Sequence, residues 1–315
     1  MLQNTPISPL KTAAYTLLAL IAFAANSVLC RMALEMRVDG AAIDAGSFTV
    51  LRLASGIAAL FIILAIKSKL SKKSVATDSD TPTPSRGSWF SGIMLFVYAG
   101  GFSYAYISLE TATGALILFA MVQMTMIFMS LYAGHKLAMT EWLGLLLAFS
   151  GLVYLMLPGA SAPSIGGLLL MSAAGIGWGF YTLAGKSSRD PLLDTSYNFL
   201  RTLPFIAVLA LFNLDSYYLS TQGVVLAIVS GAITSGLGYT LWYVALTSLK
   251  TLQAAVLQLL VPVIAAVGGV LFIEEVLSAR LIISALLILG GIGLVVAGKK
   301  LLSASAKILG KGNKV

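Results

Sequence analysis

A six-residue pattern occurs twice in this chain, and each copy carries an arginine into an apolar stretch. The segment SFTVLR at 47–52 returns 149 residues later as SYNFLR at 196–201. The two copies lie at similar places in the two halves of a chain of 315 residues. Because recurrence at a fixed offset is typical of repeated structural units, the pattern predicts two related halves.

The composition indicates a lipid environment. With 58% hydrophobic and 10% charged residues, and a mean hydropathy of +0.94, the chain has too little polar surface to cover a soluble globule of 33.0 kDa. The first apolar run is too long for the core of a signal peptide and many others follow it, so we interpret it as a true membrane span. No targeting segment is predicted.

The apolar runs predict an all-α integral membrane protein. Windows of about 20 apolar residues place ten helices at 11–33, 43–66, 89–109, 112–133, 140–157, 165–186, 194–213, 221–247, 251–272 and 278–298. Nine helices are the alternative, since only short turns around Glu110 and Lys250 separate two of the pairs. Strands are not expected, because the runs are continuous and longer than a barrel strand requires.

The positive charges predict the topology. With the N-terminus inside, 15 of the 20 Lys and Arg residues fall on the cytoplasmic side, and Arg31, Arg37 and Arg280 fall outside. Both termini and a flexible linker at 67–88 are therefore predicted to be cytoplasmic. The net charge of +8 is explained as a topology signal and attraction to anionic lipid, so the bilayer is an expected partner and nucleic acid is not.

Weaker matches between the halves support the repeat and define its bounds. Tyr106 and Leu109 match Tyr243 and Leu246, three residues apart in each copy. We predict a first five-helix repeat at 1–157, a second at 158–298, and a basic cytoplasmic tail at 299–315. Since five helices is an odd number, the second repeat must be inverted relative to the first.

Aromatic residues recur at helical spacing in both halves. Tyr98, Phe102 and Tyr106 stand at i, i+4 and i+8, and Tyr239 and Tyr243 repeat the arrangement. Such rings can pack against neighbouring helices or form interfacial belts. Two equivalent stripes favour a lining of a cavity between the halves, with Trp178 as a further member.

Polar groups at membrane depth give further candidates for substrate contact. Asn26, Gln123 and Gln258 can bind a solute or can bond another helix. Arg52 lies about nine residues inside its helix, roughly 13 Å along the axis. It either bonds helix-end carbonyls and locks the repeat interface, or holds a substrate carboxylate. Arg201 is nearer a helix start and can extend to the cytoplasmic interface.

Several small or cyclic residues are candidate hinges. These are Gly101, Gly238 and Pro262. Further candidates are Gly100 and Gly236 near the two glycines, and Pro204 in the 194–213 stretch. The lone Cys30 and His135 predict neither an internal disulfide nor a metal site, and no cofactor is expected. The run from Gly179 to Ser187 has one residue too many for a phosphate loop and follows a membrane span, so ATP binding is rejected.

The ten spans, the Ser-aromatic-x-x-Leu-Arg segment of each half and the closing Glu275-x-x-Ser278 together resemble the drug/metabolite transporter superfamily. Within it the chain is most similar to EamA-type exporters, and among these to the bacterial YddG aromatic amino-acid exporters. The resemblance implies alternating-access export of amino acids, with broad selectivity, across the bacterial inner membrane.

The sequence leaves alternatives to the export of amino acids. Other small metabolites or cationic drugs are alternative cargoes, and a scaffold that transports nothing is an alternative of another class. An enzyme is not expected, because no His-Glu-x-x-His, Gly-x-Ser-x-Gly or paired carboxylates at membrane depth occur. The acidic residues fall at helix ends, so facilitated and proton-coupled transport both stay open, and the oligomeric state is not indicated.

Overall fold

A computed structural model describes residues 8–35, 42–71, 86–134, 138–157, 162–214, 218–249 and 251–312. Throughout these ranges the regular structure is helical, apart from an isolated bridge between Ile43 and Leu219. The elements are α1 (Pro9–Leu34), α2 (Ala45–Ser71), α3 (Trp89–Ala105), α4 (Thr111–Tyr132), α5 (Met139–Met156), α6 (Ile165–Gly185), α7 (Pro191–Leu200), α8 (Leu203–Phe212), α9 (Thr221–Val229), the π-helix η2 (Ser230–Leu237), α10 (Gly238–Leu246), α11 (Thr251–Gln258), α12 (Leu260–Ile273) and α13 (Ala279–Gly312).

Within the described ranges, eight helical stretches are long and apolar enough to cross a membrane. A shorter apolar helix follows at Ala279–Val295, and α3 is 17 residues long. The protein is therefore a helical multi-pass membrane protein, as the sequence predicts. The count of ten crossings and the cytoplasmic position of the termini stay predictions.

Three stretches predicted as single helices are composite. The 194–213 stretch is divided into α7 and α8 just before Pro204, and the 251–272 stretch into α11 and α12 just before Pro262. Proline lacks an N–H and its ring clashes with the carbonyl four residues earlier, which disrupts the preceding helical turn. The third stretch, 221–247, contains η2 between α9 and α10.

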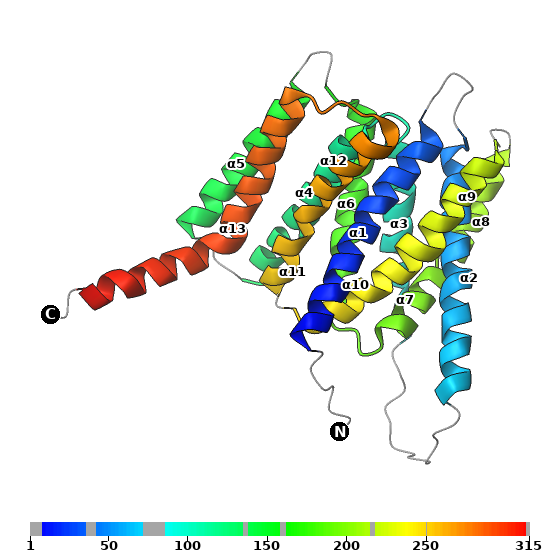
Figure 1. The fold of residues 1–315 in the computed structure, drawn as a ribbon, viewed down its shortest axis with the longest axis horizontal. Helices are drawn as coiled ribbons and strands as arrows, with labels where there is room; N and C mark the ends of the chain where they lie inside the picture. The colour runs from blue at the N-terminus through cyan, green and yellow to red at the C-terminus, as the bar shows by residue number, and fades with distance from the viewer. Residues whose placement is uncertain are drawn as a thin grey trace.

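The last helix is longer than predicted. It was expected to end at 298, before a basic tail, but α13 continues to Gly312. Figure 1 shows its final part bending away from the bundle. The added stretch is rich in Leu, Ala and Lys, which are strong helix formers.

The helices pack so that the two halves of the chain interleave (Figure 1). Helix α1 packs on α10 and α12, α2 packs on η2, and α6 packs on α3 and α4, while α5 and α13 pair at one side. The crossing of α2 and η2 is especially close at Gly231, where an added Cβ would lie 1.9 Å from the carbonyl oxygen of Arg52. Only glycine fits there.

The bundle has two ends. Helix α1 begins and α2 finishes at one end, and α1 finishes and α2 begins at the other (Figure 1). After the predicted topology we name these the inner end and the outer end.

Candidate functional site

A fully buried arginine lies at the contact between the two halves. The side chain of Arg52, on α2, is 1% exposed. Its Nε donates to the hydroxyl of Ser235 at 3.1 Å, and its Nη2 donates to the hydroxyls of Tyr98 at 3.0 Å and Tyr239 at 2.8 Å. The guanidinium carbon also lies 4.7 Å from the centre of the Phe102 ring. One arginine thereby joins α2 and α3 to η2 and α10.

This bonding corrects one sequence-based expectation. If structural, Arg52 was expected to bond helix-end carbonyls, but its partners are side-chain hydroxyls in the interior of the bundle. Burying an ion costs several kcal/mol even after relaxation, whereas a hydrogen bond from a charged group contributes roughly 1.5–3 kcal/mol. Three such bonds and a cation–π contact therefore offset a desolvation cost of the same order.

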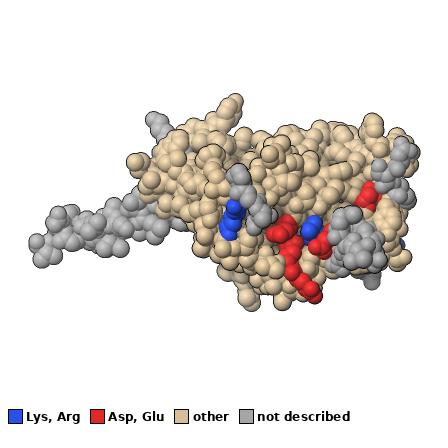
Figure 2. All heavy atoms as spheres, turned by 90° about the horizontal axis from the view of Figure 1, so that it is seen from above, with Lys and Arg blue, Asp and Glu red and all other residues tan. Residues whose placement is uncertain are grey.

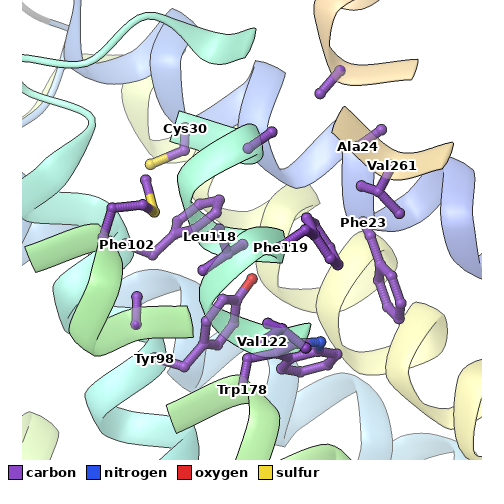
Figure 3. Close-up of a cluster of buried hydrophobic side chains, with 14 of the residues drawn as sticks. Phe23, Ala24, Cys30, Tyr98, Phe102, Leu118, Phe119, Val122, Trp178 and Val261 are labelled. Atoms are coloured by element: carbon purple, nitrogen blue, oxygen red, sulfur yellow. The ribbon is translucent and has the colours of Figure 1, made fainter. Parts of the chain in front are cut away.

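Five rings form an aromatic cluster around this arginine: Phe23, Tyr98, Phe102, Trp178 and Tyr239. The ring centre of Trp178 lies 4.6 Å from that of Tyr239, 4.9 Å from that of Tyr98 and 5.3 Å from that of Phe23. Figure 3 shows Tyr98 of α3 beside Trp178 of α6, with Phe102 of α3 and Phe23 of α1 on either side of them. The predicted stripes of the two halves thus meet, and in this conformation their rings pack against one another.

Asn26 fastens α1 to the π-helix beside the cluster. Its Oδ1 accepts hydrogen bonds from Ser230 at 2.8 Å, from Ser235 at 3.3 Å and from Thr234, and its Nδ2 lies 3.5 Å from the Tyr239 hydroxyl. A π-helix inserts an extra residue per turn and is often found at functional sites. Here it brings three hydroxyls to one amide oxygen.

Tyr106 and Tyr243 extend the cluster in two directions. Tyr106 packs edge-on against Phe102 at 4.8 Å, and its hydroxyl donates to the carbonyl of Thr111. Tyr243 stacks on Tyr181 at 5.3 Å and its hydroxyl donates to the Tyr181 carbonyl. Both tyrosines were predicted site residues.

The remaining predicted residues lie at less central places. Gln123 is buried on α4. Gln258 is fully buried where α11 ends, and neither atom of its amide has a hydrogen-bond partner among the described residues. Gly101 allows α3 to approach α6, because an added Cβ would meet the Leu170 carbonyl at 2.7 Å. Gly238 begins α10, directly after η2.

Arg201 lies toward the inner end, against the residues that precede α3. It follows the last residue of α7 and is half-buried. Its Nη1 donates to the carbonyls of Arg86 at 2.6 Å and Tyr197 at 3.0 Å. The second arginine of the repeat is therefore the one that bonds backbone carbonyls.

A network between the halves closes the inner end. The carboxylate of Asp194 accepts from the backbone N–H of Gly87 at 2.8 Å, and the side-chain oxygen of Asn198 accepts from the N–H of Ser88 at 2.9 Å. Lys67 forms a loose ion pair with Asp190 at 3.7 Å. The start of α7 is thus tied to the residues that precede α3.

A matching network closes the outer end. The carboxylate of Asp44 accepts from the backbone N–H groups of Ser47 at 2.8 Å and Tyr218 at 3.0 Å, and from the side-chain amide of Asn213. Burial raises the pKa of this carboxyl, but these hydrogen bonds outweigh burial and hold the pKa below its usual value. The start of α2 is thus tied to the residues that precede α9.

Charged groups at the outer end also join α1, α4 and α12. Arg31 lies 3.4 Å from a carboxylate oxygen of Glu275, which accepts from the backbone N–H of Thr111 at 2.9 Å. Burial, together with the nearby Glu275 carboxylate, raises the pKa of Glu110. Figure 2, which looks onto this end, shows a few acidic and basic side chains on a largely uncharged surface.

A cleft of about 910 Å³ opens near the inner end between α1, α10 and α11. Polar groups such as Thr12, Thr16 and Gln253 line it together with apolar residues, and Arg189 contributes a positive charge. Leu20 also lines the cleft, one helical turn before Phe23 of the aromatic cluster. The cleft therefore approaches the cluster from the inner end.

Sequence reasoning missed the polar residues of η2 and the pair Asp194 and Asn198. The signal for the first was present, because Ser230, Thr234 and Ser235 place three hydroxyls in one apolar stretch. For the pair Asp194 and Asn198, the signal was the repeated segment itself, which contains Asn198. Neither signal identifies the partner, since each bond joins residues more than 100 positions apart.

Three comparisons with known proteins show what this helical bundle is similar to. Residues 165–297 match the model of the EamA-like transporter family. An uncharacterized protein of Pseudomonas aeruginosa is 46% identical over 287 residues, which cover 91% of this chain and 95% of that protein. A solved crystal structure of a 19% identical protein matches with a TM-score of 0.57, covering 90% of this chain and 97% of that one, and so shares the fold.

The second half of the chain, at residues 165–297, therefore carries a domain of the EamA-like transporter family. The protein is accordingly a multi-pass membrane transporter of small molecules and not an enzyme.

Proposed function

We propose that this protein exports amino acids, aromatic ones included, across the bacterial inner membrane by alternating access, in the manner of the YddG exporters. The observation that carries the proposal is the aromatic cluster around Arg52, where residues from both halves meet at the centre of a transporter bundle. Aromatic faces give dispersion and stacking to a large side chain. The amide of Asn26 beside the cluster, and that of Gln123 buried on α4, suit an ammonium or a carboxylate.

The closed ends support alternating access. Networks between the halves bridge the inner end at Asp194 and the outer end at Asp44, and the cluster lies between them. Opening one network at a time would expose the cluster to one side. In this proposal Gly238 and Pro262 are hinges, because each stands beside a change of helix geometry, and Gly101 is a third.

The outward direction follows the resemblance to the YddG exporters, and the cleft near the inner end would give a cytoplasmic solute an approach toward the cluster once the Asp194 network opens. Both termini are cytoplasmic in this proposal, and the repeats at 1–157 and 158–298 are inverted. Since an exporter takes up its substrate from a millimolar pool inside the cell, a binding free energy of about 4 kcal/mol suffices. Selectivity is therefore expected to be broad.

Counterflow in proteoliposomes tests the proposal. Vesicles carrying the protein should exchange several neutral amino acids with modest preference, measured with and without a pH gradient. An effect of the gradient would favour proton exchange over facilitated export. Transport confined to sugar nucleotides or quaternary amines, with amino acids inert, would contradict the proposal, and the absence of any flux would favour a scaffold.

A pair of tryptophans provides a matched control for the site. Trp178 is buried in the cluster, whereas Trp142, on α5, has 54% of its surface exposed. Trp178→Phe should reduce flux, because the smaller ring loses contacts with Tyr98 and Tyr239. Trp142→Phe should leave flux unchanged, and equal flux in the two variants would refute the site assignment.

A further inference from the structure

The positive charge of Arg52 is not balanced by a carboxylate in the part of the chain that the structure describes. Its three hydrogen-bond partners are the neutral hydroxyls of Tyr98, Tyr239 and Ser235. The ion pairs of Arg31 with Glu35 and Glu275, and of Lys67 with Asp190, lie at the two ends of the bundle instead. Buried charges are ordinarily paired, so an unbalanced one at membrane depth is unusual.

Two N–H groups of the residues in this cluster have no hydrogen-bond partner among the described residues. These are Nη1 of Arg52 and Nε1 of Trp178, both buried. The Trp178 ring packs against Tyr98 and Tyr239, the two tyrosines that bind Arg52, so both groups belong to one cluster. In folded proteins the large majority of buried donors have a partner. Both groups can only donate a hydrogen bond, and Nη1 belongs to the charged guanidinium itself.

We infer that this centre binds the carboxylate of the transported solute, with Arg52 as its counter-ion. The inference rests on the proposed function and adds a requirement to it: the cargo must carry an anionic group. A guanidinium N–H forms a strong, charge-assisted hydrogen bond with a carboxylate oxygen, and Nη1 is the nitrogen of Arg52 that is left free to donate one. The hydroxyls of Tyr98 and Tyr239 orient the guanidinium, and the indole N–H of Trp178 is a further donor.

The ring of Phe102 must move away from the guanidinium before the solute can bind there. Its ring covers the guanidinium, with 4.7 Å between the ring centre and the guanidinium carbon. Binding exchanges this cation–π contact for an ion pair with the carboxylate. The displaced ring can then contact the solute's side chain, which couples recognition of the carboxylate to recognition of an aromatic group.

The first test uses the unaltered protein and three competitors of similar size. Against counterflow of phenylalanine, 3-phenylpropionate keeps the carboxylate and lacks the ammonium, whereas phenethylamine and phenylalaninamide lack the carboxylate. We expect 3-phenylpropionate to compete and the other two to be weaker by about 30-fold or more, because they leave the buried charge unpaired. Equal competition by phenethylamine would overturn the inference while leaving amino-acid export intact.

The second test compares the arginines of the two repeated segments. Arg52→Gln should abolish the preference for 3-phenylpropionate over phenethylamine, and Arg52→Lys should retain part of it. Arg201→Gln is the matched control and should keep the full preference, since Arg201 bonds backbone carbonyls at the inner end. An unchanged preference in Arg52→Gln would also overturn the inference.

A binding measurement separates failure of the inference from failure of the proposed function. Thermal unfolding of the purified protein in detergent, with 3-phenylpropionate or phenethylamine added, reports binding without flux. If no amino acid is exchanged but 3-phenylpropionate alone stabilises the protein, the anion site stands and amino-acid export fails. If neither compound stabilises the protein or competes, the anion site is refuted.

Discussion

Arg52 and Arg201 end the two copies of one six-residue segment, yet the bundle uses them differently. Arg52 lies inside a continuous helix, is 1% exposed and bonds three hydroxyls from three elements. Arg201 lies just past the end of α7, is half-buried and bonds two backbone carbonyls. Equivalent sequence positions therefore do not imply equivalent chemistry.

The residue three positions after each arginine explains part of the difference. Ser55 follows Arg52 and allows α2 to continue, whereas Pro204 follows Arg201 and separates α7 from α8. A proline in a helix disrupts the turn before it. Arg201 thus stands at a helix end beside backbone carbonyls, while Arg52 stays in a closed helical turn and must find partners on other elements.

The largest expected difference between the two positions concerns stability. Arg52→Ala removes the shared partner of three buried hydroxyls and leaves a cavity, so it should lower the free energy of unfolding by about 3–5 kcal/mol. Arg201→Ala loses hydrogen bonds at a half-exposed site and should cost about 1 kcal/mol. Denaturant unfolding of the purified variants in detergent measures both losses.

Arg52→Met is the control for packing, because it keeps much of the side-chain volume without the charge. If the ion itself destabilises the core, this variant should recover part of the loss seen in Arg52→Ala. Equal losses in Arg52→Ala and Arg201→Ala would remove the contrast between the two positions.

The next largest difference in stability is expected at two glycines, one packed against Arg52 and one against Arg201. An added Cβ at Gly231 would lie 1.9 Å from the backbone oxygen of Arg52, whereas at Gly92 it would lie 2.7 Å from the Cβ of Arg201. Both contacts involve atoms fixed to the backbone, but the contact at Gly231 is much the closer and lies within the continuous helix α2. Gly231→Ala should therefore cost about 3 kcal/mol and Gly92→Ala about 1 kcal/mol in the same unfolding measurement. The reverse order would place the tighter crossing at Arg201.

The aromatic rings that cover the two guanidinium groups should differ in their contributions to stability, by less than the two glycines do. Phe102 lies 4.7 Å from Arg52 in the core, and Trp89 lies 5.8 Å from Arg201 and is 57% exposed. A desolvated cation–π contact contributes about 2 kcal/mol and an exposed one about 0.5–1 kcal/mol. Phe102→Leu should consequently destabilise the protein more than Trp89→Leu. Unfolding midpoints of the two variants measure the difference, and a lower midpoint for Trp89→Leu would mean that the Arg201 contact is the stronger.

The smallest expected effect is a pH dependence at the start of the first repeated segment. The pKa of Asp44 is lower in the folded protein than in the unfolded chain, so its contribution to stability is present above the unfolded pKa and is lost as the pH falls through the folded pKa. Because Asp44 is partly exposed, the loss should stay below about 1 kcal/mol. Asp44→Asn should flatten this part of a stability profile measured between pH 6 and pH 3, and an unchanged profile would show that the carboxylate contributes nothing there.

Much of the site was predictable because it depends on spacing within single helices. Tyr98 and Phe102 are four residues apart on one helix, and the structure places them together as that spacing requires. The depth of Arg52 also follows from counting residues along its span. Its partners did not follow, because Tyr239 is 187 positions away and the sequence carries no signal for the contact.

The same limit applies to helix geometry. Pro204 and Pro262 mark the places where α7 and α11 end, and proline acts through local sterics that a sequence displays directly. The π-helix at Ser230–Leu237 has no comparable mark. It is stabilised by tertiary contacts, among them the bonds from its hydroxyls to Asn26 and the close packing of Gly231 on α2.

The sequence by itself determined that this protein is a helical membrane protein, since 58% hydrophobic residues in long runs leave no other stable arrangement of the backbone. It also displays the recurrence of one six-residue pattern at 47–52 and 196–201, from which we predict the repeat. Only the tertiary structure decided that Arg52 meets tyrosines from both halves while Arg201 meets carbonyls at one end. A buried charge is satisfied by whichever polar groups packing brings within about 3 Å, and packing depends on all helices at once.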